Sequence, residues 1–460
     1  MAFADIKRSQ SAAHKFTFRV TAIDGSDVRT LWEGDHLGEA EPAFEKHALE
    51  HRAKGSTATV ALDSFRLDIE RRWCERTLVS RPPSVTPIRR ASGKRSAGKA
   101  RPKILFMPLE FPTWLGGGHS WSYAAALAYE TALQAAGCEV TTINTAAAPY
   151  HRKILRDQRF DQVWIHAHPR HLSDFHFRQW IGEIAPVRVL LCGESLTYSP
   201  EKVAAEPWLA AHGRTVELWA PFLTHALCVD PRDVDAMREG TDTRPGVPAM
   251  HWPQAVPKAF VRPVNERPTL DRAVFVGTLY PPRDRWAWDL DGLLEKLDSP
   301  ESDAFTWLFE RSHEWIQRAY DRTQARSPWW RLHALGLYNR GQQLLRRHAF
   351  GNFLGALSKG VATVALPSMV QTYSGRVIEG MAAGRPVIAQ RIPDHPDVFA
   401  DELELLHYAS AEELGEQIAR LKREPSRAST IATLARKNLL ANHTVERRTA
   451  EILRFVTGEA

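Results

Sequence analysis

The chain has 460 residues, of which 43% are hydrophobic and 25% charged, as in a globular protein with room for two full domains and a small extra module. No run of about 18 apolar residues occurs, and the N-terminus lacks the pattern of a secretory signal, so we expect no membrane span and a cytoplasmic protein. The net charge of +6 leaves polyanionic partners open, while four widely spaced cysteines form neither a disulfide framework nor a metal-ligand spacing.

Residues 1–79 are predicted to form a small α+β module. Segment 16–24 alternates apolar and polar residues, as a half-buried strand does, and a turn signal at 25–27 precedes a returning strand. A helical pattern then ends at Gly55, and a further strand pattern follows. Residues 80–102 are rich in Pro, Ser, Gly and basic residues and almost lack large apolar ones, which predicts a flexible basic linker.

From Lys103 the pattern changes to strands that alternate with helices. Residues 103–260 contain short continuous apolar runs, which are typical of strands buried on both faces. Strand, helix and strand in succession imply right-handed crossovers and a parallel, doubly wound sheet. A second series of this kind fills residues 261–460 and includes a helical insertion at 310–350 that is rich in Trp and Arg. The expected fold class is therefore α/β, with two Rossmann-like domains.

Two loops after predicted strands of the first domain carry candidate catalytic groups. Gly116, Gly117 and Gly118 allow close backbone approach and a positive φ, and His119 follows them at the start of a helix. The imidazole of His119 titrates near neutral pH, which makes it a candidate general base for an acceptor hydroxyl. Glu194 follows another strand and is a second candidate for that role. A plain tight turn and a histidine that only orients the acceptor remain alternatives.

The most informative stretch is residues 361–390, VATVALPSMVQTYSGRVIEGMAAGRPVIAQ. After a strand and a loop, Ser374 is placed to cap a helix that ends at Gly384. In an open parallel sheet, ligands bind beyond the carboxyl ends of the strands, where this helix begins. Free backbone N–H groups, the helix dipole and a basic side chain suit a diphosphate, so we predict donor binding by Ser374, Gly375 and Arg376.

Glu379 lies in the same helix, outside the apolar stripe of Val377, Ile378, Met381 and Ala382. A carboxylate can accept hydrogen bonds from both hydroxyls of a ribose, as acidic residues do in dinucleotide sites. Glu379 is therefore predicted to bind the ribose of the donor. A solvated glutamate on the helix surface is the alternative.

Several segments resemble one family. SGRVIEGMAAGRPVIA resembles the C-terminal signature of the group 1 glycosyltransferases of GT-B fold and is closest to their spore-maturation-type branch. VFVGTLYPPR resembles the first strand and glycine turn of that family's C-terminal domain, and HWPQAVPKAF resembles its interdomain crossover. The resemblance extends over roughly residues 103–457. It implies two domains that face each other across a cleft, a nucleotide-diphosphate sugar as donor substrate, no cofactor and no bound metal.

The resemblance also implies roles for individual residues. Gly277 and Thr278 should approach the nucleotide, and Arg283 is a candidate for binding the diphosphate. Many members carry a Glu, seven further residues and a second Glu; the second corresponds to Glu379, but the first position holds Gln371. An amide can hydrogen-bond a sugar hydroxyl or sit near the reacting centre but carries no charge, which leaves the sugar and the stereochemical course open.

The expected function is metal-independent transfer of a sugar from a nucleotide diphosphate to an acceptor hydroxyl. A sugar-nucleotide epimerase of the same architecture and a non-catalytic binding protein remain alternatives. The acceptor is a glycan, a protein, a natural product or a modified DNA base; arginines interleaved with aromatic residues in 310–350 keep nucleic acid among these. Two Asp-x-Asp pairs, at 233/235 and 289/291, fall in helix-like segments, and we interpret them as chance rather than as a metal site.

Overall fold

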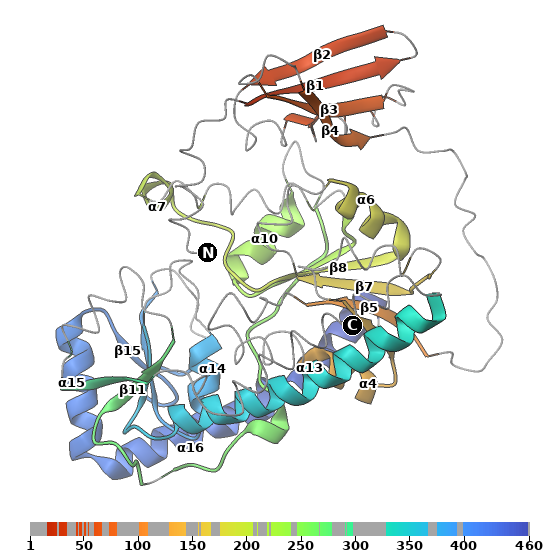
Figure 1. Cartoon of the computed structure of the whole chain (residues 1–460). Coiled ribbons are helices and arrows are strands. Elements are labelled where there is room, and N and C mark those ends of the chain that lie inside the picture. Colours follow the sequence, from red (N-terminus) through yellow and green to blue (C-terminus); the bar gives the residue numbers. More distant parts are fainter. Residues whose placement is uncertain are drawn as a thin grey trace. The chain divides into compact units, whose positions relative to one another are not determined.

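A computed structural model describes the chain in stretches, drawn as coloured ribbons in Figure 1. It separates into two compact units, residues 1–100 with 170–180 and residues 101–169 with 181–460. The described residues are 16–24, 27–34, 43–44, 46–47, 50–51, 54, 59–66, 73–80, 101–108, 128–143, 155, 158–166, 175–205, 209, 219, 222–240, 246–265, 267–277, 290, 292–297, 328–366, 375–392 and 399–458.

The first unit contains a four-stranded antiparallel sheet in the order β2-β1-β3-β4. Its strands are β1 (Phe16–Asp24), β2 (Asp27–Gly34), β3 (Thr59–Arg66) and β4 (Trp73–Ser80). The first three were predicted, and helical turns occur between β2 and β3 as expected. β4 was missed because charged residues interrupt its apolar pattern, as an edge strand tolerates. The predicted linker lies outside the described residues from 81 to 100.

The second unit begins with a six-stranded sheet in the order β10-β9-β8-β7-β5-β6, and all neighbouring strands are parallel. Its strands are β5 (Lys103–Met107), β6 (Glu139–Thr142), β7 (Gln162–His166), β8 (Val187–Cys192), β9 (His225–Cys228) and β10 (Ala249–His251). The helices of this part are α4 (Ala128–Ala135), α7 (Pro200–Ala205), α10 (Pro231–Glu239) and the short η6 (Lys258–Phe260), while α6 (Phe175–Ile184) is divided between the two units at residue 180.

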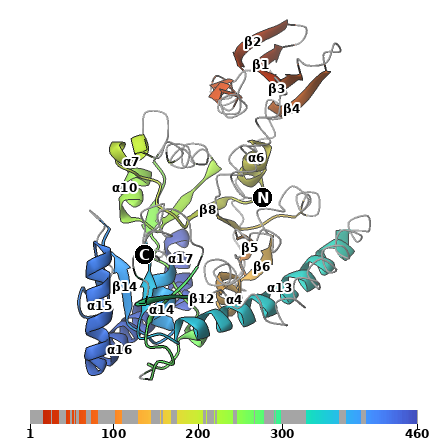
Figure 2. The same cartoon turned by 60° about the vertical axis from the view of Figure 1, so that its left-hand side comes forward.

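A second parallel sheet follows in the order β12-β11-β13-β14-β15. Its strands are β11 (Ala273–Val276), β12 (Leu294–Leu297), β13 (Thr363–Ala365), β14 (Val387–Gln390) and β15 (Leu406–Tyr408). Figure 2 shows α14, α15 and α16 beside this sheet. The helices are α13 (Pro328–Leu357), α14 (Gly375–Ala382), α15 (Ala411–Arg423), α16 (Pro425–Asn442) and α17 (Val445–Thr457). Two doubly wound parallel sheets confirm the predicted α/β class.

Two details of this sheet were not predicted from the sequence. β12 lies beside β11 at the edge of the sheet, and two of its four residues are charged, so it lacks the apolar run of a buried strand. The end of α13, in the predicted insertion and just beyond it, buries Phe350, Phe353, Leu354 and Leu357. This end is therefore the crossover helix that leads into β13, packed into the core.

The chain passes between the two parallel sheets twice, and the two crossovers are hydrogen-bonded to each other. Val256 N–H donates to the carbonyl of His443 at 3.1 Å, and Val445 N–H donates to the carbonyl of Val256 at 3.0 Å. α17 then packs on α4. The ring of Phe455 on α17 also lies 5.2 Å from the ring of His225 on β9. The last helix of the sequence thus returns to the first parallel sheet.

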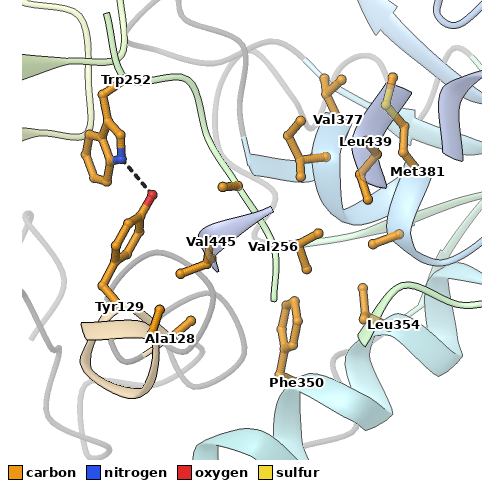
Figure 3. Packing of buried hydrophobic residues seen from close by; sticks show 14 of the residues in the cluster. Ala128, Tyr129, Trp252, Val256, Phe350, Leu354, Val377, Met381, Leu439 and Val445 are labelled. Atoms are coloured by element: carbon orange, nitrogen blue, oxygen red, sulfur yellow. Dashed lines mark hydrogen bonds between the residues drawn. The ribbon is translucent and has the colours of Figure 1, made fainter. Parts of the chain in front are cut away.

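A buried cluster surrounds these crossovers, and Figure 3 shows part of it. Trp252 Nε1 donates a hydrogen bond of 2.6 Å to the hydroxyl of Tyr129 on α4, and the two rings lie 5.6 Å apart. Val256, Phe350 and Leu439 continue the cluster toward the second sheet. The polar tips of the two aromatic residues satisfy each other, which lets both rings be buried.

In the described part of the chain, no helix is long and apolar enough to cross a membrane. Cys138, Cys192 and Cys228 are free and buried, as expected for cysteines that pack as small hydrophobes.

Gly380 marks the closest approach of α14 to its sheet. A Cβ at this position would lie 2.8 Å from both Thr363 Cγ2 and Val387 Cγ2. We predict that Gly380→Ala lowers the free energy of unfolding by about 1–3 kcal/mol through overpacking. Gly336 in α13 has no atom within 4 Å of such a Cβ, so Gly336→Ala should instead stabilise by about 0.5–1 kcal/mol. Urea unfolding of both variants checks this, and equal effects would contradict the close packing.

His443, between α16 and α17, is buried and packs its ring 4.8 Å from that of Phe399. Burial, with added repulsion from Arg448 and His251 that outweighs Glu451, lowers the pKa of His443 to about 4. In the unfolded chain the pKa is about 6.5, so the unfolded state takes up the proton first as the pH falls. We predict that this residue removes about 3 kcal/mol of stability between neutral pH and pH 4.

The test compares His443→Gln with the wild type in urea unfolding at several pH values. The difference between the two proteins should change with pH only below about 6.5, with the variant losing less stability than the wild type. Parallel pH profiles would show that His443 is not held neutral.

Candidate functional site

The second parallel sheet has a topological switch point. From β11 the chain goes to β12 on one side and then to β13 on the other. Ligands of doubly wound folds bind at such a point, beyond the carboxyl ends of the strands. Gly277 follows β11 directly, and α14 is the helix that follows β13. The predicted donor residues Gly277, Gly375, Arg376 and Glu379 therefore come together at one edge of the sheet.

The side chain of Arg376 links three elements at this edge. Its Nε donates a hydrogen bond of 2.6 Å to the carbonyl of Val276, the last residue of β11. Its Nη1 donates to the carboxylate of Glu379, one turn further along α14. Its guanidinium carbon lies 4.6 Å from the ring centre of Phe353 on α13, a cation–π contact. These contacts hold the guanidinium at the carboxyl end of β11.

Gly277 lies against the same guanidinium and leaves no room for a side chain. A Cβ here would lie 2.9 Å from Cζ of Phe275 and 3.5 Å from Nη2 of Arg376. A glycine is thus required by the close approach of the backbone to the ring, and it leaves the peptide after β11 uncovered by a side chain of its own.

Glu379 is buried, with only 5% of its side chain exposed. The alternative of a solvated surface glutamate is therefore wrong. Although Glu379 lies outside the apolar stripe, α14 packs against β13 and β14 and also against α13 and α16, so that residues 377–382 are all buried. Arg376 holds one carboxylate oxygen, Oε2, while Oε1 accepts no hydrogen bond from the described residues.

This arrangement suits an anionic ligand with neighbouring hydroxyls. The first N–H groups of α14 lack intrahelical partners, and they carry the positive end of the helix dipole. Arg376 adds a fixed positive charge beside them. A diphosphate that takes over the guanidinium would release the carboxylate of Glu379 for hydrogen bonds with hydroxyls.

A second group of polar residues lies beyond β8 and β9, at the carboxyl edge of the first parallel sheet. Ser195 Oγ donates to Asp230 Oδ2 at 2.6 Å, and Leu196 N–H donates to Asp233 Oδ2 at 2.9 Å. Asp230 also caps α10 through the backbone N–H of Arg232. These bonds fix the backbone immediately after Glu194.

The side chain of Glu194 reaches solvent, but dense protein around it removes much of the nearby water. This desolvation raises the pKa of its carboxyl group. Burial likewise raises the pKa of Asp233 to about 6, partly opposed by hydrogen bonds from residues 196 and 197. A carboxyl group whose pKa is raised toward neutrality is suited to accept a proton.

The first Asp-x-Asp pair does not form a metal site. Asp233 is buried under the loop after β8, whereas 74% of the Asp235 side chain is exposed and lies near Arg238. In the described part of the chain, no group of three or more His, Cys, Asp or Glu residues is arranged to hold a metal ion. The second pair, at 289 and 291, lies outside the described residues.

Several predicted site residues also lie outside the described residues. They are Gly116, Gly117, Gly118, His119, Thr278, Arg283, Gln371 and Ser374. Their predicted roles stay predictions.

Other residues at these edges were not singled out from the sequence. Phe353, which stacks under Arg376, is separated from it by an entire strand and loop, and no local pattern signals that contact. The role of Asp230 as a helix cap could have been predicted, since an Asp followed by Pro231 is a frequent helix start. Its hydrogen bond with Ser195 forms only because β8 and β9 end side by side.

Known proteins resemble this chain in fold and, over its C-terminal part, in sequence. Residues 311–454 match a family model described as glycosyl transferase-like. Sucrose-phosphate synthase from Thermosynechococcus elongatus is similar in structure, with 15% identity and a TM-score of 0.50, over 78% of this chain and 100% of that one. The C-terminal part of the chain is glycosyltransferase-like. Together with the two doubly wound sheets, the likeness to the synthase gives the chain the GT-B fold of glycosyltransferases.

Two further solved structures are similar at lower scores. HepE from Anabaena, in complex with UDP and glucose, has 13% identity and a TM-score of 0.45, over 78% of this chain and 100% of that one. A glycosyltransferase from Rickettsia africae has 11% identity and a TM-score of 0.46, with the same coverage. No curated protein matches the chain.

The ion pair of Arg376 and Glu379 generates a prediction about stability. Arg376→Met leaves a buried carboxylate without its partner, which should cost about 3–5 kcal/mol of unfolding free energy. Adding Glu379→Gln removes that unpaired charge, so the double variant should be more stable than Arg376→Met alone. Arg447→Met, which breaks a pair with the arginine half exposed, should cost less than about 1 kcal/mol.

Urea unfolding of Arg376→Met, Glu379→Gln, the double variant and the control Arg447→Met measures these differences. Strictly additive effects at 376 and 379 would show that the two groups do not interact in solution.

Proposed function

We propose that this glycosyltransferase-like chain transfers a sugar from a nucleotide-diphosphate donor to an acceptor hydroxyl without a metal ion. The single observation that carries the proposal is the placement of Arg376 and Glu379 on α14 at the switch point of the second sheet. This edge offers a positive charge, free helix N–H groups and a carboxylate within one turn of helix. Those are the groups that a diphosphate and a ribose need.

Donor binding in this proposal exchanges partners at α14. The diphosphate binds the N–H groups of the first turn and the guanidinium of Arg376. Glu379, now without its arginine, accepts hydrogen bonds from the ribose hydroxyls. Gly277 gives the nucleotide access to the backbone after β11, and Thr278, Arg283 and Ser374 are proposed to complete the site.

In the transfer, the bond between sugar C1 and the diphosphate oxygen breaks, and its electron pair leaves with the diphosphate. The acceptor oxygen forms a bond to C1 and gives its proton to a base. The helix N-terminus and Arg376 stabilise the charge that develops on the leaving group. Glu194 is the proposed base, because its raised pKa favours proton uptake, with His119 as the second candidate. Gln371 is proposed to contact a sugar hydroxyl.

Finer points follow the sequence resemblance. SGRVIEGMAAGRPVIA supports a place in the spore-maturation-type branch. A cytoplasmic location is proposed because free, buried cysteines suit a reducing setting. The acceptor is proposed to be a glycan, protein or natural product in preference to the modified DNA base that the sequence also leaves open. Absence of any gel shift with single- or double-stranded DNA at about 50 mM salt is the expected result, since phosphate contacts are strongest at low salt.

Turnover tests the proposal directly. UDP, GDP, TDP and CDP sugars are screened first by thermal shift, where a ligand at 100 times its Kd stabilises by about 2.7 kcal/mol. The best donors are then incubated with acceptors in the presence of EDTA. Sugar transfer that persists in EDTA supports the proposal. Acceptor-independent conversion of the sugar nucleotide would identify an epimerase, and binding without turnover a non-catalytic protein.

Glu379→Ala should weaken binding of the preferred nucleotide diphosphate by about 1.5–3 kcal/mol, because hydrogen bonds to a charged acceptor are lost. Isothermal titration calorimetry measures the affinity. Glu416→Ala changes an exposed glutamate on α15 and removes the same charge, so it should leave the affinity unchanged. A folded Glu379→Ala protein with wild-type affinity would rule out the ribose role.

Glu194→Gln should lower kcat by about 100-fold or more, as expected when a general base is removed. In the wild type, kcat should rise with pH as the carboxyl group ionises, at a pH above the usual range for glutamate because its pKa is raised. The variant should lack this rise. Glu201→Gln on α7 replaces an exposed glutamate and serves as control. An unchanged pH profile in Glu194→Gln would move the base to His119 or another group.

A further inference from the structure

A pocket of about 200 Å³ lies at the end of the second parallel sheet opposite the donor site. Val361 and Arg385, which line it, each precede a strand of that sheet by two residues, whereas Gly277 and α14 follow strands. Side chains of α15 and α16 close the other side. The pocket and the proposed donor site are therefore on opposite edges of the sheet.

Arg385 gives the pocket a buried positive charge. Only 4% of the residue is exposed. Its Nη1 donates to the backbone carbonyl of Asn265, and its Nη2 donates to that of Val361 at 2.6 Å. Its Nε has no hydrogen-bond partner among the described residues. Of the five N–H donors of a guanidinium, these bonds use two.

No carboxylate among the described residues lies within ion-pairing distance of Arg385; both of its bonds are to neutral carbonyls. Desolvation lowers its pKa to about 10, so the side chain is charged at neutral pH. A buried charge normally has a counter-charge, because burial without one costs several kcal/mol. Within the part of the chain that the structure describes, no carboxylate offsets the charge of Arg385.

The rim of the pocket adds a second cation. Lys422 Nζ on α15 lies 2.8 Å from Asp271 Oδ2. Both residues line the pocket, and the lysine side chain is 31% exposed and the aspartate 82%. The two charges of this pair cancel, and the pocket keeps the net positive charge of Arg385.

We propose that this pocket binds a small oxyanion, such as a carboxylate or a phosphate group, between Arg385 and Lys422. Charge-assisted hydrogen bonds to an oxyanion are the strongest that a guanidinium makes, and they would satisfy its remaining donors. A volume of about 200 Å³ is below the roughly 300–1,000 Å³ of pockets for drug-sized ligands, so it suits a small anion better than a nucleotide sugar. The ligand is therefore distinct from the donor of the proposed reaction.

The test titrates inorganic phosphate, and separately acetate, into the full-length protein at constant ionic strength set with chloride. Isothermal titration calorimetry and thermal shift follow binding. Lys422→Gln removes the rim cation, and Lys437→Gln removes the same charge from an exposed position on α16 outside the pocket. Arg385→Lys keeps the charge but not the planar donors. The two anions distinguish phosphate from carboxylate as the preferred group.

The expected result is saturable binding of at least one anion that Lys422→Gln weakens roughly tenfold, as for loss of a charge-assisted bond, and that Lys437→Gln leaves unchanged. Arg385→Lys should weaken it as well; if that variant does not fold, Lys422→Gln alone decides. Binding with equal affinity in Lys422→Gln and the wild type places the anion elsewhere, for example at α14, and overturns the proposal. Absence of saturable binding also overturns it. Neither outcome depends on whether the chain turns over a nucleotide sugar.

Discussion

The bond from Arg376 to the carbonyl of Val276 ties the start of α14 to the end of β11, and the proposed donor site depends on it. A helix that follows β13 has no local reason to contact β11. The guanidinium makes that contact, stacks on Phe353 and holds Glu379 in place. One side chain thereby organises the helix terminus, the strand end and the carboxylate. The positive charge of Arg376 is neutralised by Glu379, and a diphosphate could take the place of that carboxylate.

The second parallel sheet has an arginine at the carboxyl ends of its strands, Arg376, and another at the amino ends, Arg385, and the two have different partners. At the carboxyl edge Arg376 is paired with a carboxylate, so a ligand must exchange partners to bind. At the amino edge Arg385 has only backbone carbonyls, so a ligand would supply a missing charge. α14 runs from one edge to the other, since it begins beside Arg376 and ends three residues before Arg385. It packs closely on the sheet at Gly380.

Much of this architecture was predictable because buried parallel strands have a strong local signature. The apolar runs of β5, β8, β11 and β13 were recognised, as was α14 with its terminal glycine. Edge strands such as β4 and β12 were missed, since an edge strand tolerates charged residues that interrupt the apolar pattern. At the site, the sequence identified Arg376 and Glu379, but their pairing and the stacking on Phe353 depend on tertiary contacts that no spacing encodes. The sequence placed Glu379 outside the apolar stripe, yet the residue is buried, because α14 contacts β13 and β14 as well as α13 and α16.

The central claim is that α14 and the end of β11 hold the donor nucleotide. The most direct measurement is the structure of the complex with the nucleotide sugar that stabilises the protein most. The account predicts diphosphate oxygens within about 2.7–3.2 Å of Arg376 and the first N–H groups of α14, and ribose hydroxyls at similar distances from Glu379. A nucleotide bound at the first parallel sheet, or one that leaves Glu379 paired with Arg376 and untouched, would contradict it.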